Sequence, residues 1–260
     1  LEGKMLMTAF ATGAVGVATG SLFAALAVSI AVGVALSMLH GYACVTHRGD
    51  QVVLGMAITM TAAGLTVVLG IAWFAQGGQT PPVPDSVRLD PWVMVTGSLA
   101  AVAGVWWLLY HTRFGLRLRA AGENPTMVDA AGVSVKALRY QALALNGVFS
   151  ALAGSYLVLS QNPSFIPNMT AGRGYMALAA LIFGKWHPVG ALLACLLFGF
   201  LDAVSIRLQG VEIPAALGGG AVPVQFIQAL PYLLTVVLLA GFIGKSVAPA
   251  ALGRPYVKER

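Results

Sequence analysis

Residues 5 to 42 read MLMTAFATGAVGVATGSLFAALAVSIAVGVALSMLHGY and contain no Asp, Glu, Lys or Arg. A helix of about 20 residues crosses the hydrocarbon core of a bilayer, which is about 30 Å thick. This stretch therefore predicts two membrane crossings, near residues 3 to 17 and 20 to 44. The first is short for a full span and is expected to be the remnant of a broken helix. Three glycines are predicted to turn the chain back: Gly13, Gly16 and Gly20.

The rest of the chain has the same apolar character. Of its residues 58% are hydrophobic and 9% are charged, and its mean hydropathy is +0.83. A water-soluble fold of this size could not cover so much apolar surface. Further spans are predicted near residues 52–74, 92–110, 139–160, 188–206 and 226–244. Residues 172–184 are apolar but short, so a broken or re-entrant helix and a simple span both stay open.

These segments predict an all-α polytopic integral membrane protein with about eight membrane-embedded segments, in a single domain over residues 1–260. The net charge of +6 does not indicate nucleic acid, because Lys and Arg lie in loops and in the tail. Counting positive charges in short loops orients the protein. Residues 46–51, 111–139, 185–187 and the tail fall on the cytoplasmic side. Residues 75–91, 161–171 and 207–225 fall on the opposite side.

No constellation of residues indicates catalysis or metal binding. The four histidines, His40, His47, His111 and His187, are scattered at segment ends without a carboxylate and a nucleophile at useful spacing. The two cysteines, Cys44 and Cys195, are interpreted as packing residues. We therefore expect no enzymatic activity, no cofactor and no metal site.

The longest charged stretch, residues 111–139, is the most informative loop. Asn124-Pro125 can begin a short helix with Asn124 or Thr126 as its cap. Small residues, Ala130, Ala131 and Gly132, keep that helix slim. A slim helix on the cytoplasmic face suits docking into a groove of a partner protein. The alternative is a solvated loop that only orients the chain.

The same stretch resembles a hallmark of a permease family. Residues 113–125 read RFGLRLRAAGENP and are followed by AAGV at 130–133. This pattern is similar to R-x-G-L-x-L-R-A-x-G-E-N-P in permease subunits of bacterial ATP-binding-cassette (ABC) importers, in the superfamily of ribose and branched-chain amino-acid permeases. Three more stretches resemble it: LEGKMLM at 1–7, GRGYMALAALIFGKWHP at 172–188 and LFGF at 197–200. Residues 172–188 resemble the simple-sugar and nucleoside branch most.

The resemblance implies a multi-pass protein of the bacterial cytoplasmic (inner) membrane that performs no chemistry itself. Its implied partners are cytoplasmic ATPase subunits, a second permease subunit and an extracytoplasmic solute-binding protein. It also implies that the chain is truncated and that a further helix precedes Leu1. Lys4 stands where the family suggests an apolar residue. The residues implied in coupling to the ATPase are Arg119, Gly122, Glu123, Asn124, Pro125, Asp129, Ala130 and Gly132.

Polar residues within the apolar segments are candidates for the substrate pathway, because polar groups in a bilayer are costly. Neutral hydrogen-bonding side chains suit a nucleoside or a sugar. Helix-to-helix hydrogen bonding is the alternative for each, and Arg173 can instead snorkel to the outer interface. The candidates are Asn146, Ser150, Ser160, Gln161, Arg173, Tyr175 and Asp202.

A weak internal echo suggests an inverted repeat. Gly3-Lys4-Met5 followed by Gly13 has the same spacing as Gly174-Tyr175-Met176 followed by Gly184. In the alternating topology the two stretches run in opposite directions. Two short segments that meet near mid-membrane are a common way to build a transport pathway.

Three other functions stay open. A proton-coupled secondary transporter would use Asp202 or another buried carboxylate, and its uptake would survive ATP depletion. A non-transporting membrane anchor would tolerate Asp202→Ala and Asn146→Ala. An ABC permease for branched-chain amino acids is the third.

Overall fold

The computed structural model describes residues 1–208, 212–213, 220–221, 229, 233 and 246–257. The chain divides into two compact units, which are described separately. The first comprises Leu1–Tyr175 and Pro249–Arg260, and the second comprises Met176–Ala248. The prediction of one domain over the whole chain stays a prediction.

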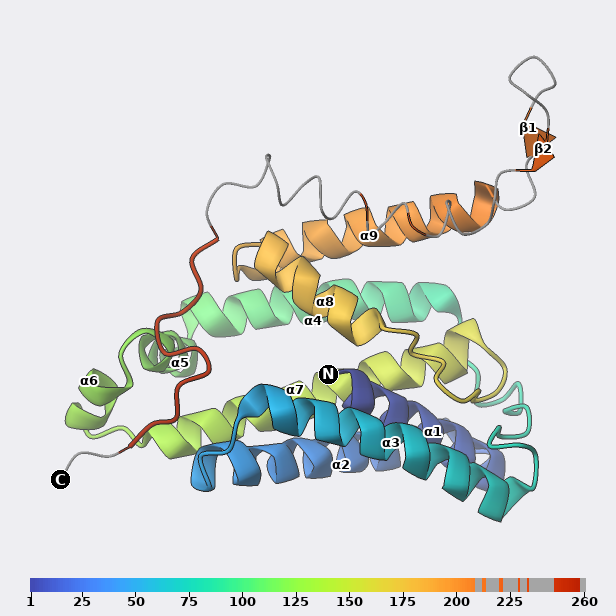
Figure 1. Cartoon of the computed structure of the whole chain (residues 1–260), viewed down its shortest axis with the longest axis horizontal. Coiled ribbons are helices and arrows are strands. Elements are labelled where there is room, and N and C mark those ends of the chain that lie inside the picture. The colour runs from blue at the N-terminus through green and yellow to red at the C-terminus, as the bar shows by residue number, and fades with distance from the viewer. Residues whose placement is uncertain (209–211, 214–219, 222–228, 230–232, 234–245, 258–260) are drawn as a thin grey trace. The chain divides into compact units, whose positions relative to one another are not determined.

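Helices that pack side by side form the core of the first unit (Figure 1). The central helix, α1, is buried along most of its length against its neighbours. The helices of this bundle are α1 (Glu2–Thr19), α2 (Leu22–Gly41), α3 (Gln51–Phe74) and α7 (Val135–Tyr156). Two π-helical turns extend α2 and α7: η1 (Tyr42–Thr46) and η2 (Leu157–Gln161). The predicted segments near 20–44, 52–74 and 139–160 therefore match α2–η1, α3 and α7–η2 closely.

Of the three glycines predicted to turn the chain, only Gly20 lies between the first two helices. Gly20 has φ 61°, and its N–H donates to the Gly16 carbonyl at 3.0 Å. Gly13 and Gly16 lie inside α1, so the prediction that they turn the chain is wrong. Both are places of close contact: a Cβ on Gly13 would lie 3.3 Å from the Thr80 hydroxyl, and one on Gly16 would lie 3.3 Å from Val83. A small residue in a membrane helix serves close packing as readily as a turn.

Small residues also bring α2 and α7 together. A Cβ on Gly33 would lie 2.5 Å from the Gly147 carbonyl oxygen, and one on Gly147 would lie 2.6 Å from the Gly33 carbonyl oxygen. The two backbones therefore touch. In lipid, helices associate through such close packing because lipid tails are as apolar as leucine.

Hydroxyl groups also form hydrogen bonds between α1, α2 and α7. The Thr12 and Ser155 hydroxyls lie 2.9 Å apart, and Ser155 donates to the Ser29 hydroxyl at 3.0 Å. Thr8 donates to the Ser150 carbonyl at 3.2 Å. Buried hydroxyls that are satisfied in this way cost little and fix the register of α1 on α7.

The two ends of the first unit agree with the predicted topology. The loops at 75–90 and 162–172 meet at one end, where the Val83 N–H donates to the Pro163 carbonyl at 2.7 Å. The α5–α6 region and the C-terminal segment meet at the other (Figure 1). There the Ala251 N–H donates to the Gly122 carbonyl at 2.9 Å. Loops predicted on one side of the membrane thus contact each other.

The α4 helix (Pro91–His111) contacts mainly α5 and η2, and none of its residues is buried. Its apolar surface suits contact with lipid. Asp90 accepts a hydrogen bond from the Trp92 N–H at 2.8 Å and Pro91 occupies the first turn, so this helix begins where capping residues predict.

The second unit contains the end of α8 (Arg173–Phe183), α9 (Pro188–Leu208) and two strands. Phe183 of α8 and Phe198 of α9 pack with ring centroids 5.6 Å apart. At 11 residues, α8 is too short for a full crossing, which favours the broken or re-entrant alternative. The all-α prediction is confirmed except for a pair of two-residue strands, β1 (Glu212–Ile213) and β2 (Gly220–Ala221).

Five helices of the described residues are long and apolar enough to cross a membrane: Leu22–Thr46, Gln51–Phe74, Pro91–His111, Val135–Gln161 and Pro188–Arg207. The span predicted at 226–244 lies almost wholly outside the described residues. Of the cysteines, Cys44 is buried, as predicted, whereas Cys195 is exposed in the described part of its unit. The packing interpretation of Cys195 is not supported there, because Ala194 and Phe198 are the residues of α9 in the cluster that packs against α8.

Candidate functional site

Local capping builds the region between α4 and α7, where the coupling helix is predicted. Thr112 begins α5 (Arg113–Glu123) by accepting from the Gly115 N–H at 3.1 Å. Asn124 begins α6 (Pro125–Ala130) by accepting from the Met127 N–H at 3.2 Å. Ser134 begins α7 by accepting from the Ala137 N–H at 3.3 Å. The predicted short helix is confirmed, and Asn124 rather than Thr126 is its cap.

Two contacts attach α5 to the end of α4. Gly115 lies directly against the backbone of Leu108 and Leu109, where any Cβ would overlap main-chain atoms. The Arg119 guanidinium lies 4.5 Å from the centroid of the Tyr110 ring, a cation–π contact. Arg119, predicted to act in coupling, therefore also attaches α5 to α4.

The α6 helix packs on a small apolar core. The core consists of Ala121, Val128, Val135 and Leu138, with Phe114, Val133 and Tyr256 packed against it. Tyr256 belongs to the C-terminal segment, which also accepts a hydrogen bond at the Arg254 carbonyl from Arg139 at 3.1 Å. Sequence reasoning placed this tail on the same side of the membrane but missed its contact with α6. The only signal was Tyr256, the single aromatic residue among residues 249–260.

The predicted coupling residues divide over two surfaces. Glu123 and Asn124 line a groove of about 590 Å³ between α5 and α6, together with the exposed Met127. Asp129 and Ala130 lie on another face, beside Tyr256. The others have backbone roles: Pro125 occupies the first turn of α6, Gly132 has φ 79°, and a Cβ on Gly122 would lie 3.6 Å from Pro249.

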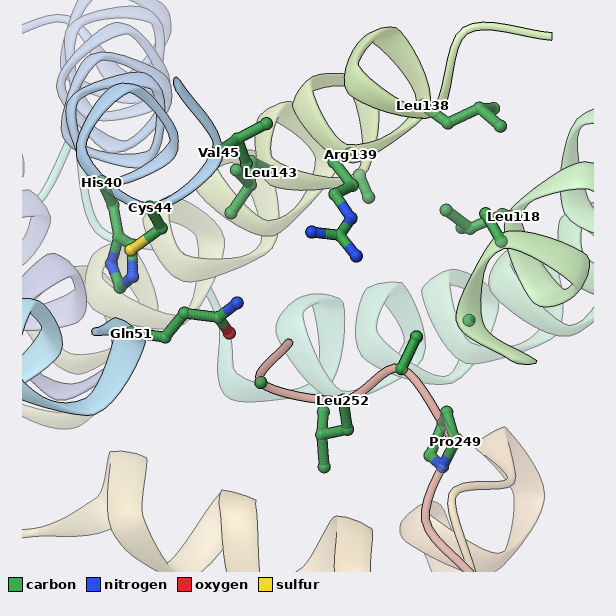
Figure 2. A pocket seen from close by; sticks show the side chains of 15 residues that line it. His40, Cys44, Val45, Gln51, Leu118, Leu138, Arg139, Leu143, Pro249 and Leu252 are labelled. Atoms are coloured by element: carbon green, nitrogen blue, oxygen red, sulfur yellow. The ribbon is translucent and has the colours of Figure 1, made fainter. Parts of the chain in front are cut away.

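A cavity of about 290 Å³ lies next to this region and is shown in Figure 2. Leu118 and Leu138 contribute apolar walls, and Pro249 and Leu252 of the C-terminal segment lie along one side. Its polar lining consists of His40, Gln51 and Arg139, whose guanidinium points into the space (Figure 2). The cavity therefore combines one fixed positive charge with neutral hydrogen-bonding groups.

The structure brings two pathway candidates on α7 to α1. Asn146 accepts a hydrogen bond at Oδ1 from the Lys4 ammonium at 3.1 Å. Ser150, one turn further, is buried, and its hydroxyl has no partner among the described residues. Lys4 is 4% exposed, although the family resemblance suggests an apolar residue there. Nothing in the spacing of the sequence predicts its contact with Asn146, 142 positions away.

The remaining candidates lie elsewhere. Arg173 donates to the Gln161 side-chain oxygen at 3.1 Å, and Tyr175 is exposed. The Ser160 hydroxyl is buried and has no partner among the described residues. Asp202 lies on α9 in the second unit, where its carbonyl accepts from Ser205 at 2.8 Å.

The starts of α1 and α8 touch. The two carboxylate oxygens of Glu2 accept from the Gly172 N–H at 2.9 Å and from the Gly174 N–H at 2.6 Å. A carboxylate at the start of a helix satisfies free N–H groups and interacts favourably with the helix dipole. The two helices differ in length, 18 against 11 residues. The inverted repeat itself stays a prediction.

Comparison with known proteins identifies the family. Residues 1–244 match the model of the permease component of branched-chain amino acid transport systems. The chain belongs to this permease family. No solved structure matches the chain.

Among curated proteins, the permease is 34% identical to the nucleoside ABC transporter permease protein NupC of Lactococcus lactis, over all of this chain and 87% of that protein. It is 36% identical to the guanosine ABC transporter permease protein NupQ of Bacillus subtilis, over 99% of this chain and 86% of that protein. It is 28% identical to the ribose import permease protein RbsC of Escherichia coli, over 80% of this chain and 68% of that protein. The permease is thus a multi-pass protein of the cytoplasmic membrane, and the resemblance found in its sequence is confirmed.

Proposed function

We propose that this permease forms half of the membrane channel of an ATP-driven importer for nucleosides or simple sugars. The observation that supports this most directly is α6, a short capped helix seated on its own apolar core at the cytoplasmic end of the first unit. A helix held in this way transmits a push from a partner to α5 and α7 as a rigid element. The similarity to nucleoside and ribose permeases supports the substrate class.

Three partners belong to this proposal. Two cytoplasmic ATPase subunits hydrolyse ATP and contact α6, a second permease subunit completes the channel, and an extracytoplasmic protein delivers the solute. The two units of this chain act together as one permease domain. Alternating access then moves the solute past polar side chains such as Asn146 and Ser150.

Uptake measured under two kinds of energy depletion tests the function. In cells that express the complete transporter, radiolabelled uridine or ribose uptake is expected to stop when ATP is depleted. It is expected to continue when an uncoupler removes the membrane potential while ATP is maintained. The opposite pattern would favour the proton-coupled rival, and absence of any uptake that depends on this chain would favour an anchor.

Charge reversal at Glu123 tests the coupling surface. Glu123 is exposed in the α5–α6 groove, so Glu123→Arg leaves the fold intact and places a positive charge where the ATPase is proposed to dock. We expect uptake and solute-stimulated ATP hydrolysis to fall at least about tenfold, since reversing a charge within an interface costs about 1.4 kcal/mol or more.

The matched control is Asp85→Arg, the same change at an exposed carboxylate in the 75–90 loop at the opposite end of the unit. It should leave both activities near the wild-type level. Solute-stimulated ATP hydrolysis that persists in Glu123→Arg would contradict the assignment of the groove as the docking surface.

A further inference from the structure

Lys4 places a positive charge in the interior of the membrane bundle. The α1 and α7 helices run parallel here, with Lys4 bonded to Asn146 and Thr8 to Ser150. Asn146 is near the middle of the apolar segment Val135–Gln161, so the pair lies near mid-membrane. A charge at this depth is costly and is normally paired with an opposite charge. Within the described residues, Lys4 has no carboxylate partner, and its one hydrogen bond is to Asn146.

Polar atoms without partners surround this pair. A Cβ on Gly33 of α2 would lie 3.2 Å from the Thr8 methyl group, and α2 runs antiparallel to α1. Ser37 lies one turn beyond Gly33, so it is at the same height in the bundle as Lys4, which lies one turn before Thr8. The buried hydroxyls of Ser37 and Ser150 and the Nδ1 atom of His40 have no hydrogen-bond partner among the described residues. Buried polar groups are almost always bonded, so these call for a ligand or a moving partner.

The hydrogen-bonding capacity of the pair defines the ligand. An ammonium group has three donors, and one of them is used by the Asn146 oxygen. Since that oxygen accepts from Lys4, the amide NH₂ of Asn146 has its two donors available for a solute. The pair itself therefore offers donors and a positive charge, and the groups that can accept are the neighbouring Ser37 and Ser150 hydroxyls and His40 Nδ1. It complements a group that only accepts, such as a carboxylate or the carbonyl edge of a nucleobase, better than the hydroxyls of a neutral sugar.

The cavity of Figure 2 lies one helical turn from this pair on α2 and α7. Ala142 and Leu143, one turn before Asn146 on α7, line the cavity of Figure 2. On α2, His40 lines it as well, one turn beyond Ser37. Asn146 is half-buried, and neither it nor Lys4 lines the cavity itself.

We infer that Lys4 and Asn146 form a solute-binding site that selects an acceptor-only group, either a carboxylate or a nucleobase carbonyl edge. The inference rests on the proposed transport function and narrows its substrate class. It predicts that a neutral sugar alone does not occupy the site.

Direct binding to the purified full-length permease, isolated with its ATPase in lipid nanodiscs, tests the inference. The probes are radiolabelled uridine for the nucleobase, ribonate for the carboxylate and ribose as the neutral sugar. We expect the wild type to bind uridine or ribonate, and whichever binds identifies the source of the acceptor group. Lys4→Met should weaken that binding at least about tenfold, equivalent to about 1.4 kcal/mol.

Two variants control for structural effects. Asn146→Asp supplies a carboxylate that takes up the Lys4 charge, so it should weaken binding as strongly as Lys4→Met while retaining the buried contact. Lys185→Met removes an exposed lysine between α8 and α9 and should change nothing. The melting temperature of each variant, measured without solute, reports on folding.

The inference is overturned if the wild type binds neither acceptor probe, if it binds ribose equally well, or if Lys4→Met changes only the melting temperature. ATP-driven uptake, measured separately with the binding protein present, distinguishes failure of the proposed binding site from failure of the proposed transport function. If ATP-driven uptake occurs and Lys4→Met does not change solute binding, the binding-site inference is overturned and the transport function stands. Absence of ATP-driven uptake overturns the function.

Discussion

Gly147→Val is expected to abolish assembly of the helix bundle. The Gly147 Cα faces the backbone of α2, and a Cβ there would lie 2.6 Å from the Gly33 carbonyl oxygen. The backbones of α2 and α7 are already in contact, so a side chain at this position forces the two helices apart. They then lose their packing and the hydrogen bonds of the neighbouring hydroxyl groups. Overpacking costs about 1–3 kcal/mol in ordinary cores and more against a rigid backbone. A loss of 3 kcal/mol changes the folded-to-unfolded ratio about a hundredfold.

The measurement is size-exclusion chromatography of the detergent-solubilised protein, followed by a thermal melt of any monodisperse fraction. The matched control is Gly64→Val on α3, where a Cβ would meet no atom within 4 Å. We expect Gly64→Val to elute and melt like the wild type and Gly147→Val to aggregate. A monodisperse Gly147→Val protein with an unchanged melting temperature would show that α2 and α7 do not pack in this register.

Glu2→Ala is expected to destabilise the junction between α1 and α8. It removes both acceptors of the Gly172 and Gly174 N–H groups, at 2.9 and 2.6 Å, and leaves these donors without their partner. Hydrogen bonds to a charged group contribute about 1.5–3 kcal/mol each. We therefore expect a loss of about 3 kcal/mol or more. Glu2→Gln, which retains one oxygen acceptor, should fall between the wild type and Glu2→Ala.

Thermal melting in detergent ranks the wild type, Glu2→Gln and Glu2→Ala by melting temperature. Limited proteolysis shows whether the loop at 162–172 becomes accessible. Gly174→Ala is an independent variant, because its Cβ would lie 2.6 Å from the Glu2 carboxylate and displace it. It should reproduce the effect of Glu2→Ala. If Glu2→Ala melts like the wild type and the loop stays protected, the carboxylate does not hold the junction.

Local rules predicted much of this structure. Long apolar stretches of about 20 residues predict most of the membrane helices, since a helix satisfies every backbone hydrogen bond within one segment in lipid. Asn124-Pro125 predicted the start of α6, because a cap and its helix lie within four residues of each other. The family pattern in residues 113–133 predicts a coupling helix there, and the structure contains a short helix at that place.

Contacts between distant residues could not be predicted in the same way. Gly13 and Gly16 suggest a turn and serve packing, and the sequence alone does not distinguish the two uses of a small residue. The contact of Tyr256 with the core under α6 joins residues more than a hundred positions apart. Lys4 was recognised as a departure from the pattern, but its partner Asn146 follows only from the parallel register of α1 and α7.

The contact between the C-terminal segment and α6 has a consequence for biosynthesis. The Ala251 N–H binds the Gly122 carbonyl, and Tyr256 completes the apolar core under α6. Translation proceeds from the N-terminus, so the ribosome supplies these residues long after α6 has been made. An incompletely translated chain therefore presents α6 without its full support. For the docking proposed at α6, the finished chain is therefore a better binding partner than a nascent one.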